Sequence, residues 1–160
     1  MYPSKKLRLR QIERELGLSF PSVVRYCDEL KKGGILATVE TGNVVFYTAA
    51  RTDERYLLEK RLFNLRVLHE SGIIDHIRQE LGNPAIALFG SFAKGEDSEE
   101  SDIDLYIETP SKKDISLEKY EKQLKRDIQM IRKKDLKELN PNLANNIING
   151  ITLNGQIEAL

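Results

Sequence analysis

The sequence predicts an α+β protein, within the broad α/β class, built from two parts that differ in pattern and in charge. In the first fifty residues, two segments with helical spacing precede an alternating segment of the kind that forms a β-hairpin. In the second half, a continuous apolar run and an alternating Asp-Ile-Asp-Leu run predict a small mixed sheet accompanied by helices. A chain of 160 residues is long enough for one ordinary domain or two small ones.

The composition is that of a soluble globular protein. Hydrophobic residues make up 40% of the chain and charged residues 31%, and no apolar run approaches the roughly 18 residues that span a bilayer. The basic start, MYPSKKLRLR, lacks the apolar stretch of a secretory signal, so we expect a cytoplasmic protein without a membrane partner. Cys27 is the one cysteine, which excludes an intrachain disulfide, and we expect it in the core.

The charge is unevenly distributed, although the net charge is zero. Residues 1–51 contain nine Lys and Arg against five Asp and Glu, whereas residues 52–160 contain sixteen against twenty. This asymmetry indicates that only the first segment is built to meet a polyanion.

Two short amphipathic helices are expected near the N-terminus. Leu9, Ile12 and Leu16 lie at helical spacing, and Gly17 follows where a left-handed residue would end the helix. Ser19 is then expected to cap a second helix. The inward stripe of this second helix is predicted to consist of Val23, Cys27 and Leu30.

A hairpin follows the second helix. After Gly33-Gly34, the alternating segments ILATVE and VVFYT flank the turn TGN. Over residues 5–50 the whole pattern resembles the winged helix-turn-helix DNA-binding family, chiefly in R-Q-I-x-R-E-L-G-L-S and V-V-R-Y-C-D-E-L-K-K-G-G-I-L. Such domains usually have another helix before this pair, and winged helices also serve as protein-docking modules.

This resemblance implies that residues 20–32 form the recognition helix, which would enter the major groove of double-stranded DNA. The DNA-binding residues that it implies are Ser22, Val24, Arg25, Lys31 and Lys32. Among them Arg25 is the best candidate for a contact with a base edge, and the two lysines would lie near phosphates.

Residues 53–81 are predicted to be mostly helical, with a division at Ser71-Gly72. The apolar positions at three- and four-residue spacing include Leu58, Leu62, Leu65, Ile73 and Ile77. This stripe either packs on its own domain or forms the seam of a homodimer. His69 and His76 lack a third ligand nearby, so we interpret them as structural or exposed residues and not as metal ligands.

The run AIALF, residues 85–89, is typical of a strand buried on both faces. Gly90 ends it and would let the backbone approach a ligand closely, while Ser91 adds a hydroxyl beside exposed N–H groups. Lys94 lies three residues further on. These three residues are predicted to form a cradle for the oxygens of a phosphate group.

The segment DIDLYIE, residues 102–108, is predicted to be a strand with Asp102, Asp104 and Tyr106 on one face and the aliphatic residues on the core face. Two carboxylates on one face repel, and burying them unpaired is costly, so a cation is expected between them. Hard oxygen ligands beside a phosphate site favour Mg²⁺ or Mn²⁺ bound jointly by the protein and substrate phosphates.

Two neighbouring segments are rich in charge. We expect the acidic loop that contains Glu96, Asp97, Glu99 and Glu100 to be solvated. Residues 112–137 contain Leu117, Tyr120 and Leu124 at helical spacing, which predicts a helix covering the sheet with a solvated charged face.

The second half resembles the nucleotidyltransferase superfamily of polymerase beta, and in particular the minimal nucleotidyltransferases of prokaryotes, including archaea. The residues that carry the resemblance are Gly90-Ser91, Lys94-Gly95 and Ser101-Asp102-Ile103-Asp104-Leu105. It covers residues 72–160, including NPNLANNIINGITLNG, which looks like a last helix, a turn at Gly150 and a final short strand.

By this resemblance, Gly90 and Ser91 hold the triphosphate of a nucleotide such as ATP, and Asp102 and Asp104 hold the metal ions. A nucleoside monophosphate then passes to an acceptor hydroxyl with release of pyrophosphate. The resemblance also implies a separate helical partner protein.

A third carboxylate in this superfamily helps to activate the acceptor, and it comes from a later strand, here DIQMI at residues 127–131. When this strand is aligned on its apolar residues, Gln129 occupies the position where the superfamily has its third carboxylate. A glutamine side chain cannot serve as a general base. Asp127 would supply the missing carboxylate if the strand starts sooner or contains a bulge. Otherwise Asp127 is a solvent-exposed residue at the start of the strand. Because losing a general base costs about 10²–10⁴ in rate, the chain is either a slow transferase or only binds nucleotide.

We therefore expect a winged helix-turn-helix in residues 1–51, a connecting helix in residues 52–82 and a small mixed-sheet nucleotidyltransferase domain in residues 83–160. The leading hypothesis is metal-dependent transfer of a nucleoside monophosphate to a protein or small acceptor, coupled to DNA binding. The alternative is a DNA-binding transcriptional regulator whose second domain is weakly active or inactive and binds only nucleotide or a partner.

Overall fold

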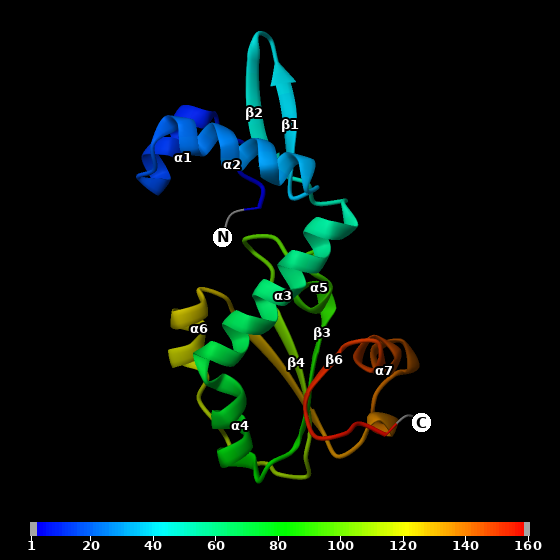
Figure 1. Ribbon diagram of the computed structural model, residues 1–160. Coiled ribbons are helices and arrows are strands. Elements are labelled where there is room, and N and C mark those ends of the chain that lie inside the picture. Colours follow the sequence, from blue (N-terminus) through cyan, green and yellow to red (C-terminus); the bar gives the residue numbers. More distant parts are fainter. Residues whose placement is uncertain (1–2, 159–160) are drawn as a thin grey trace. The chain divides into compact units, whose positions relative to one another are not determined.

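The computed structural model of the chain describes residues 3–158 (Figure 1). The chain divides into two compact units, Met1–Lys60 and Arg61–Leu160. Among the described residues, no helix combines the length and the apolar character that crossing a bilayer requires.

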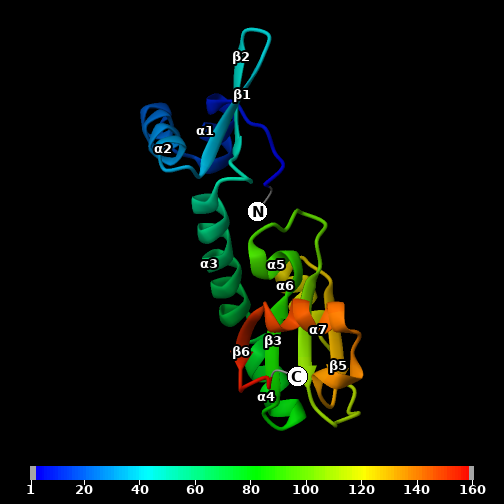
Figure 2. The ribbon, with the colours of Figure 1, turned by 90° about the vertical axis from the view of Figure 1, so that its right-hand side faces the viewer.

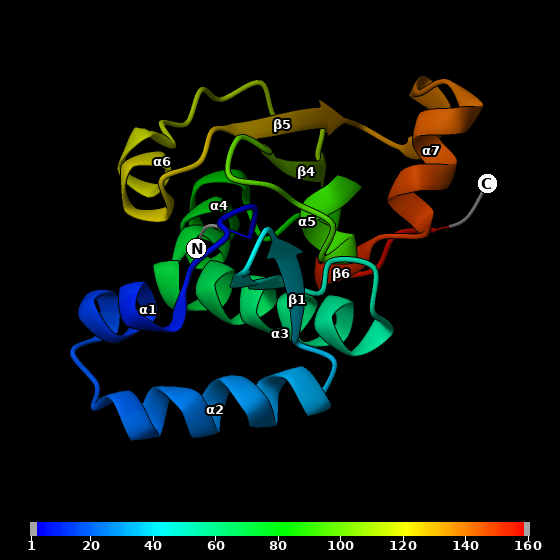
Figure 3. The ribbon, with the colours of Figure 1, turned by 90° about the horizontal axis from the view of Figure 1, so that it is seen from above.

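The first unit consists of two helices and an antiparallel hairpin. Its elements are α1 (Leu9–Leu16), α2 (Phe20–Lys32), β1 (Leu36–Thr41) and β2 (Val44–Ala49). Gly17 ends α1 in the left-handed conformation, with φ 65°, as the spacing predicted. Leu7 adds a short antiparallel bridge to Tyr47 of β2. Figure 3 shows α1 and α2 beside each other.

The inward stripes predicted for these two helices are only partly right. Val23 and Cys27 are buried, but Leu16 and Leu30 are 61% and 42% exposed. Both exposed leucines lie near the ends of their helices, and a unit of this size cannot cover every apolar position of two helices. Ser19 precedes α2 as predicted, although its side chain makes no capping hydrogen bond.

The long helical stretch is divided in two, as predicted. Helix α3 (Glu54–Ser71) spans the boundary between the units, and Gly72, with φ 78°, separates it from α4 (Ile73–Leu81). Leu58 and Leu62 belong to the stripe that was expected either to pack on its own domain or to form a homodimer seam, and they are 53% and 52% exposed. Instead, the last turns of α3 contact the core of the second unit through Leu65 and Leu68.

The second unit is built on a four-stranded mixed sheet with strand order β5-β4-β3-β6. The strands are β3 (Ala85–Phe89), β4 (Ile103–Glu108), β5 (Ile128–Lys133) and β6 (Ile151–Asn154). Strand β3 pairs antiparallel with β4 and β6, while β4 and β5 are parallel. The small mixed sheet expected from the sequence is therefore present.

Helices cover both faces of this sheet (Figure 2). The end of α3, α4 and α6 (Glu118–Leu124) pack on one face, where the rings of Tyr120 and His76 lie 5.2 Å apart. The opposite face is covered by α7 (Pro141–Ile148) and by the 3-10 turn η1 (Leu136–Glu138).

The alternation of β4 follows the prediction on the core face but not on the other. Ile103, Leu105 and Ile107 are fully buried, as expected. Tyr106, which shares a face with Asp104, is also fully buried, because it packs in the cluster beneath α7. Helix α7 thus covers most of the face that we had expected to be polar and leaves only the start of the strand near solvent.

The turn between α7 and β6 lies against β3. A Cβ atom at Gly150 would overlap the carbonyl oxygen of Leu88, so only glycine allows this close approach. The helix, the turn at Gly150 and the final strand are all present, as the resemblance implied.

Candidate functional site

The site is centred where β3 ends and the short helix α5 (Gly90–Lys94) begins. Gly90 has φ 73°, a conformation that strongly favours glycine. A Cβ atom at this position would overlap Oδ2 of Asp104 and lie 3.0 Å from its Cγ. Because Phe89 pairs with Asp104 across the two strands, the backbone at the end of β3 packs directly against this carboxylate.

Two aspartates lie at the start of β4. Asp104 is within the strand and partly buried, whereas Asp102 is exposed and comes directly before it, so the strand starts one residue later than predicted. Burial, and then the negative charge of Asp102, raise the pKa of Asp104. Within the described residues, no Lys or Arg side chain forms an ion pair with either aspartate. Two like charges thus lie close together, and no cation from the described part of the chain pairs with them.

This donor set fits a hard divalent cation that is completed by its substrate. Residues 3–158 contain no group of three or more His, Cys, Asp and Glu side chains able to hold a metal by themselves. Mg²⁺, however, is usually held by one or two carboxylates together with water and substrate phosphates. Asp102 and Asp104 are the residues that could hold Mg²⁺ or Mn²⁺ in this way.

Strand β5 places an amide beside the second aspartate. In the parallel register, Asp104 pairs with Gln129, so both side chains lie on the same face. Asp127 precedes the strand, and its carbonyl accepts a hydrogen bond from the N–H of Ile103 at 2.9 Å. Extending the register by one step puts Asp127 level with Asp102. The exposed carboxylate of Asp127 therefore lies level with Asp102, and the amide of Gln129 lies level with Asp104.

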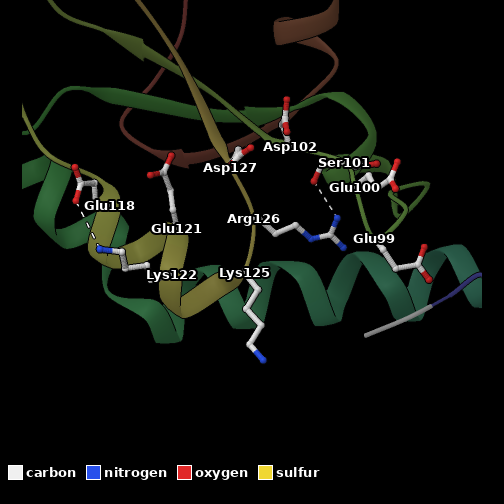
Figure 4. A pocket seen from close by; sticks show the side chains of 10 residues that line it. All are labelled: Glu99, Glu100, Ser101, Asp102, Glu118, Glu121, Lys122, Lys125, Arg126 and Asp127. Carbon is white, nitrogen blue, oxygen red and sulfur yellow. Dashed lines mark hydrogen bonds and ion pairs between the residues drawn. The ribbon is translucent and has the colours of Figure 1, made fainter.

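A cavity of about 460 Å³ opens beside Asp102 and Asp127, whose side chains are seen between those of α6 and those of Glu99 and Glu100 (Figure 4). This volume is within the range of small-molecule sites. The lining residues are Glu99, Glu100, Ser101, Asp102, Glu118, Glu121, Lys122, Lys125, Arg126 and Asp127. The contribution of α6 to this wall was missed from the sequence, because its charged positions look like an ordinary solvated face.

A buried arginine holds the loop that leads to Asp102. The side chain of Arg126 is 10% exposed, and its Nη2 lies 3.1 Å from Oδ2 of Asp97. Its Nη1 donates to the carbonyl oxygens of Ser98 and Ser101, the latter at 2.9 Å. One guanidinium therefore ties together three points of the loop between α5 and β4.

The carboxylate of Asp97 is fully buried, which contradicts the expectation of a solvated acidic loop. Its Oδ1 accepts a hydrogen bond from Nδ2 of Asn64 at 2.7 Å, and the same amide group donates to the carbonyl of Phe92 at 2.9 Å. Asn64 belongs to α3, so three distant segments meet at this carboxylate. The four carboxylates of the loop look alike in the sequence, and no local signal distinguishes the one that is buried.

The other two predicted nucleotide-binding residues lie on α5. Ser91 follows Gly90 in the first turn and is partly exposed, and Lys94 is the exposed last residue of the helix. The structure thus packs Gly90 and Asp104 directly together, with Ser91 beside them in the chain and Lys94 one helical turn further on. Of the predicted site residues, Asp102 and Asp127 line the cavity, whereas Gly90, Ser91, Lys94 and Asp104 do not.

The predicted DNA-binding residues lie on α2. Val24, Arg25, Lys31 and Lys32 are exposed, and Ser22 is partly exposed. Two of the cations face carboxylates on the same helix. Nε of Arg25 lies 3.9 Å from Glu29, and Nζ of Lys32 lies 2.7 Å from Asp28, an interaction that raises the pKa of Lys32.

Comparison with known proteins agrees with this geometry. Residues 71–157, more than half of the chain, match the family model described as Polymerase beta, Nucleotidyltransferase. Searches of curated proteins and of solved structures returned no match. The matched region contains Gly90, Asp102, Asp104 and the cavity that Asp102 and Asp127 line. The chain belongs to the polymerase beta nucleotidyltransferase family.

Proposed function

We propose that the second unit is a metal-dependent nucleotidyltransferase that transfers a nucleoside monophosphate from a nucleoside triphosphate to a hydroxyl group of a protein or small acceptor. The observation that carries the proposal is the packing of the Asp104 carboxylate against the backbone of Gly90, with Asp102 beside it and, within residues 3–158, no cationic side chain paired with either. Membership of the family supports nucleotide binding at this place.

In the proposed step, the acceptor oxygen bonds to the α-phosphorus while the bond from that phosphorus to the bridging oxygen of the β-phosphate breaks. Pyrophosphate leaves, and the hydroxyl proton passes to a base. We assign this base to Asp127, because its carboxylate lies level with Asp102 and lines the same cavity, whereas the amide of Gln129 cannot accept the proton. A divalent cation held by Asp102 and Asp104 would neutralise the charge that develops on the phosphates.

The test is calorimetric titration of the purified protein with ATP, GTP, CTP and UTP, each with and without Mg²⁺. We expect binding that requires Mg²⁺ and is lost in Asp102→Asn/Asp104→Asn. The matched control is Asp75→Asn/Asp114→Asn, which removes two exposed carboxylates outside the site. Equal binding by both double variants, or binding that ignores the metal, would overturn the proposal.

A second function is favoured by one observation, the pairing of Gln129 with Asp104. An amide at this position suits a regulator that binds nucleotide or a partner without transferring the nucleotide. In both cases we propose that α2 contacts double-stranded DNA. Under the transferase hypothesis, Asp104→Asn abolishes transfer of labelled nucleotide and leaves DNA binding intact. Under the regulator hypothesis there is no transfer, and Arg25→Ala removes the only activity.

The remaining partners are proposals of the same kind. A separate helical protein would bind the second unit, and two copies of the chain would pair through residues 53–81, which fits a symmetric DNA site. Sedimentation of a monomer at micromolar concentration without DNA would contradict the homodimer.

A further inference from the structure

A second cavity, of about 670 Å³, lies in the first unit between α1, the start of α2 and β2. Its lining residues are Lys6, Arg8, Leu9, Arg10, Gln11, Arg14, Phe20, Val45, Phe46 and Tyr47. Four of these side chains are cationic and three are aromatic, and none of them is acidic. We call this cavity the basic groove; its lining is strongly basic and rich in aromatic side chains.

The cations of the groove are less neutralised than those of α2. In the part of the chain that the structure describes, Lys6, Arg8 and Arg14 form no ion pair, and only Arg10 faces a carboxylate, that of Glu13 at 3.0 Å. On α2, two of the three cations predicted to contact DNA are paired with carboxylates one turn away. The positive charge of the first unit is therefore most available in the groove.

Two of the arginines lie over aromatic rings. The guanidinium carbon of Arg10 is 3.8 Å from the ring centre of Phe20, and that of Arg8 is 5.2 Å from the ring centre of Phe46. A guanidinium held over a ring has a fixed plane, and its other side can stack on a nucleobase. The exposed side chains of Arg8 and Arg10 leave that other side open to a ligand.

We propose that this groove binds a segment of single-stranded nucleic acid. Phosphates would pair with Lys6 and Arg14, while unpaired bases stack on the planes formed by Arg8 with Phe46 and by Arg10 with Phe20. A single strand is favoured over a duplex because the bases of a duplex are stacked on one another and offer no face to these planes. The proposal depends neither on nucleotide transfer nor on the contact of α2 with duplex DNA.

The test is fluorescence anisotropy of labelled twelve-nucleotide dT and U strands with the full chain, without nucleotide or metal. Two triple variants remove the same charge, Arg8→Ala/Arg10→Ala/Arg14→Ala from the groove and Arg25→Ala/Lys31→Ala/Lys32→Ala from α2. We expect the groove variant to weaken binding strongly, through loss of both stacking planes, and to reduce the slope of log K against log salt by about 0.7, since Arg14 is the one of its three arginines assigned to a phosphate. The α2 variant should change neither the affinity for the strand nor the salt slope.

Stacking is tested separately with Phe46→Leu, which keeps an apolar side chain but removes the ring. We expect it to weaken binding of the dT strand about 5- to 150-fold without changing the salt slope. Thermal unfolding of each variant shows that the first unit is folded. Equal losses in the two triple variants, equal competition by duplex DNA, or an unaffected Phe46→Leu variant would each overturn the proposal. None of these outcomes bears on nucleotide transfer.

Discussion

The buried pair of Arg126 and Asp97 gives the sharpest prediction about stability. Arg126→Met keeps the length of the side chain but removes the guanidinium from beside a carboxylate that is only 1% exposed. It also deletes the charged donor of two hydrogen bonds to backbone carbonyls of the loop that leads to Asp102. Breaking a buried ion pair by removing one partner typically costs about 3–5 kcal/mol.

We expect a value near 3 kcal/mol, the lower end of this range, because the amide of Asn64 still donates to Asp97. For a protein of this length, 1 kcal/mol corresponds to about 2–4 °C in Tm, so the variant should melt about 6–12 °C lower. Asp97→Asn combined with Arg126→Met should lose less than the sum of the two single changes, because the double variant leaves no unpaired charge.

The assay is thermal unfolding followed by circular dichroism, with Lys122→Met as a control, since that lysine is exposed and paired only across 3.7 Å. The control should melt within about 2 °C of the unmodified chain, as expected for an exposed ion pair. A loss below about 1 kcal/mol for Arg126→Met, or strict additivity with Asp97→Asn, would refute the claim that this pair holds the loop.

Three further predictions concern the site itself. The pKa of Asp104 is raised by burial and by Asp102, so the metal-free protein loses stability as pH rises from the ordinary carboxyl pKa through the raised value. Asp104→Asn should therefore melt higher than the unmodified chain at pH 7 without metal and gain nothing from Mg²⁺; a lower Tm would contradict this. Gly90→Ala and Gly82→Ala impose similar backbone strain, about 1–2 kcal/mol, but only the first displaces the Asp104 carboxylate. Calorimetry should show loss of Mg²⁺-dependent nucleotide binding in Gly90→Ala alone, and equal effects would count against the site. Asp127→Asn should lower the rate of labelled nucleotide transfer about 10²–10⁴-fold, whereas Gln129→Asp should leave it nearly unchanged, because Asp127 already supplies the base. A large gain in Gln129→Asp would contradict the assignment of the base to Asp127.

Much of the sheet and part of the site could be predicted from local patterns. The apolar run before Gly90 forms β3, and the alternation after Asp102 forms β4, because side-chain direction in a strand depends only on position along it. For Leu58 and Leu62, helical spacing left two outcomes open, packing on their own domain or a homodimer seam, and in the single chain both side chains are exposed. Helical spacing shows that residues share a face, but whether another element covers that face depends on distant parts of the chain.

Gln129 illustrates which part of the site can be predicted from the sequence and which part depends on the tertiary structure. Its place in β5 was predicted from the neighbouring apolar residues, whereas its pairing with Asp104 depends on which strands lie beside each other and in which register. Local periodicity cannot supply this register, because it is set by packing over the whole sheet.

By itself, the sequence determined the glycine at the end of β3, the two aspartates at the start of β4 and the family that these residues indicate. Only the tertiary structure decided that Asp97 is buried against Arg126 and Asn64 while its acidic neighbours in the loop are not. The physical reason is that burial of a charge becomes tolerable only when partners from distant segments surround it, and those partners are 29 and 33 residues away along the chain.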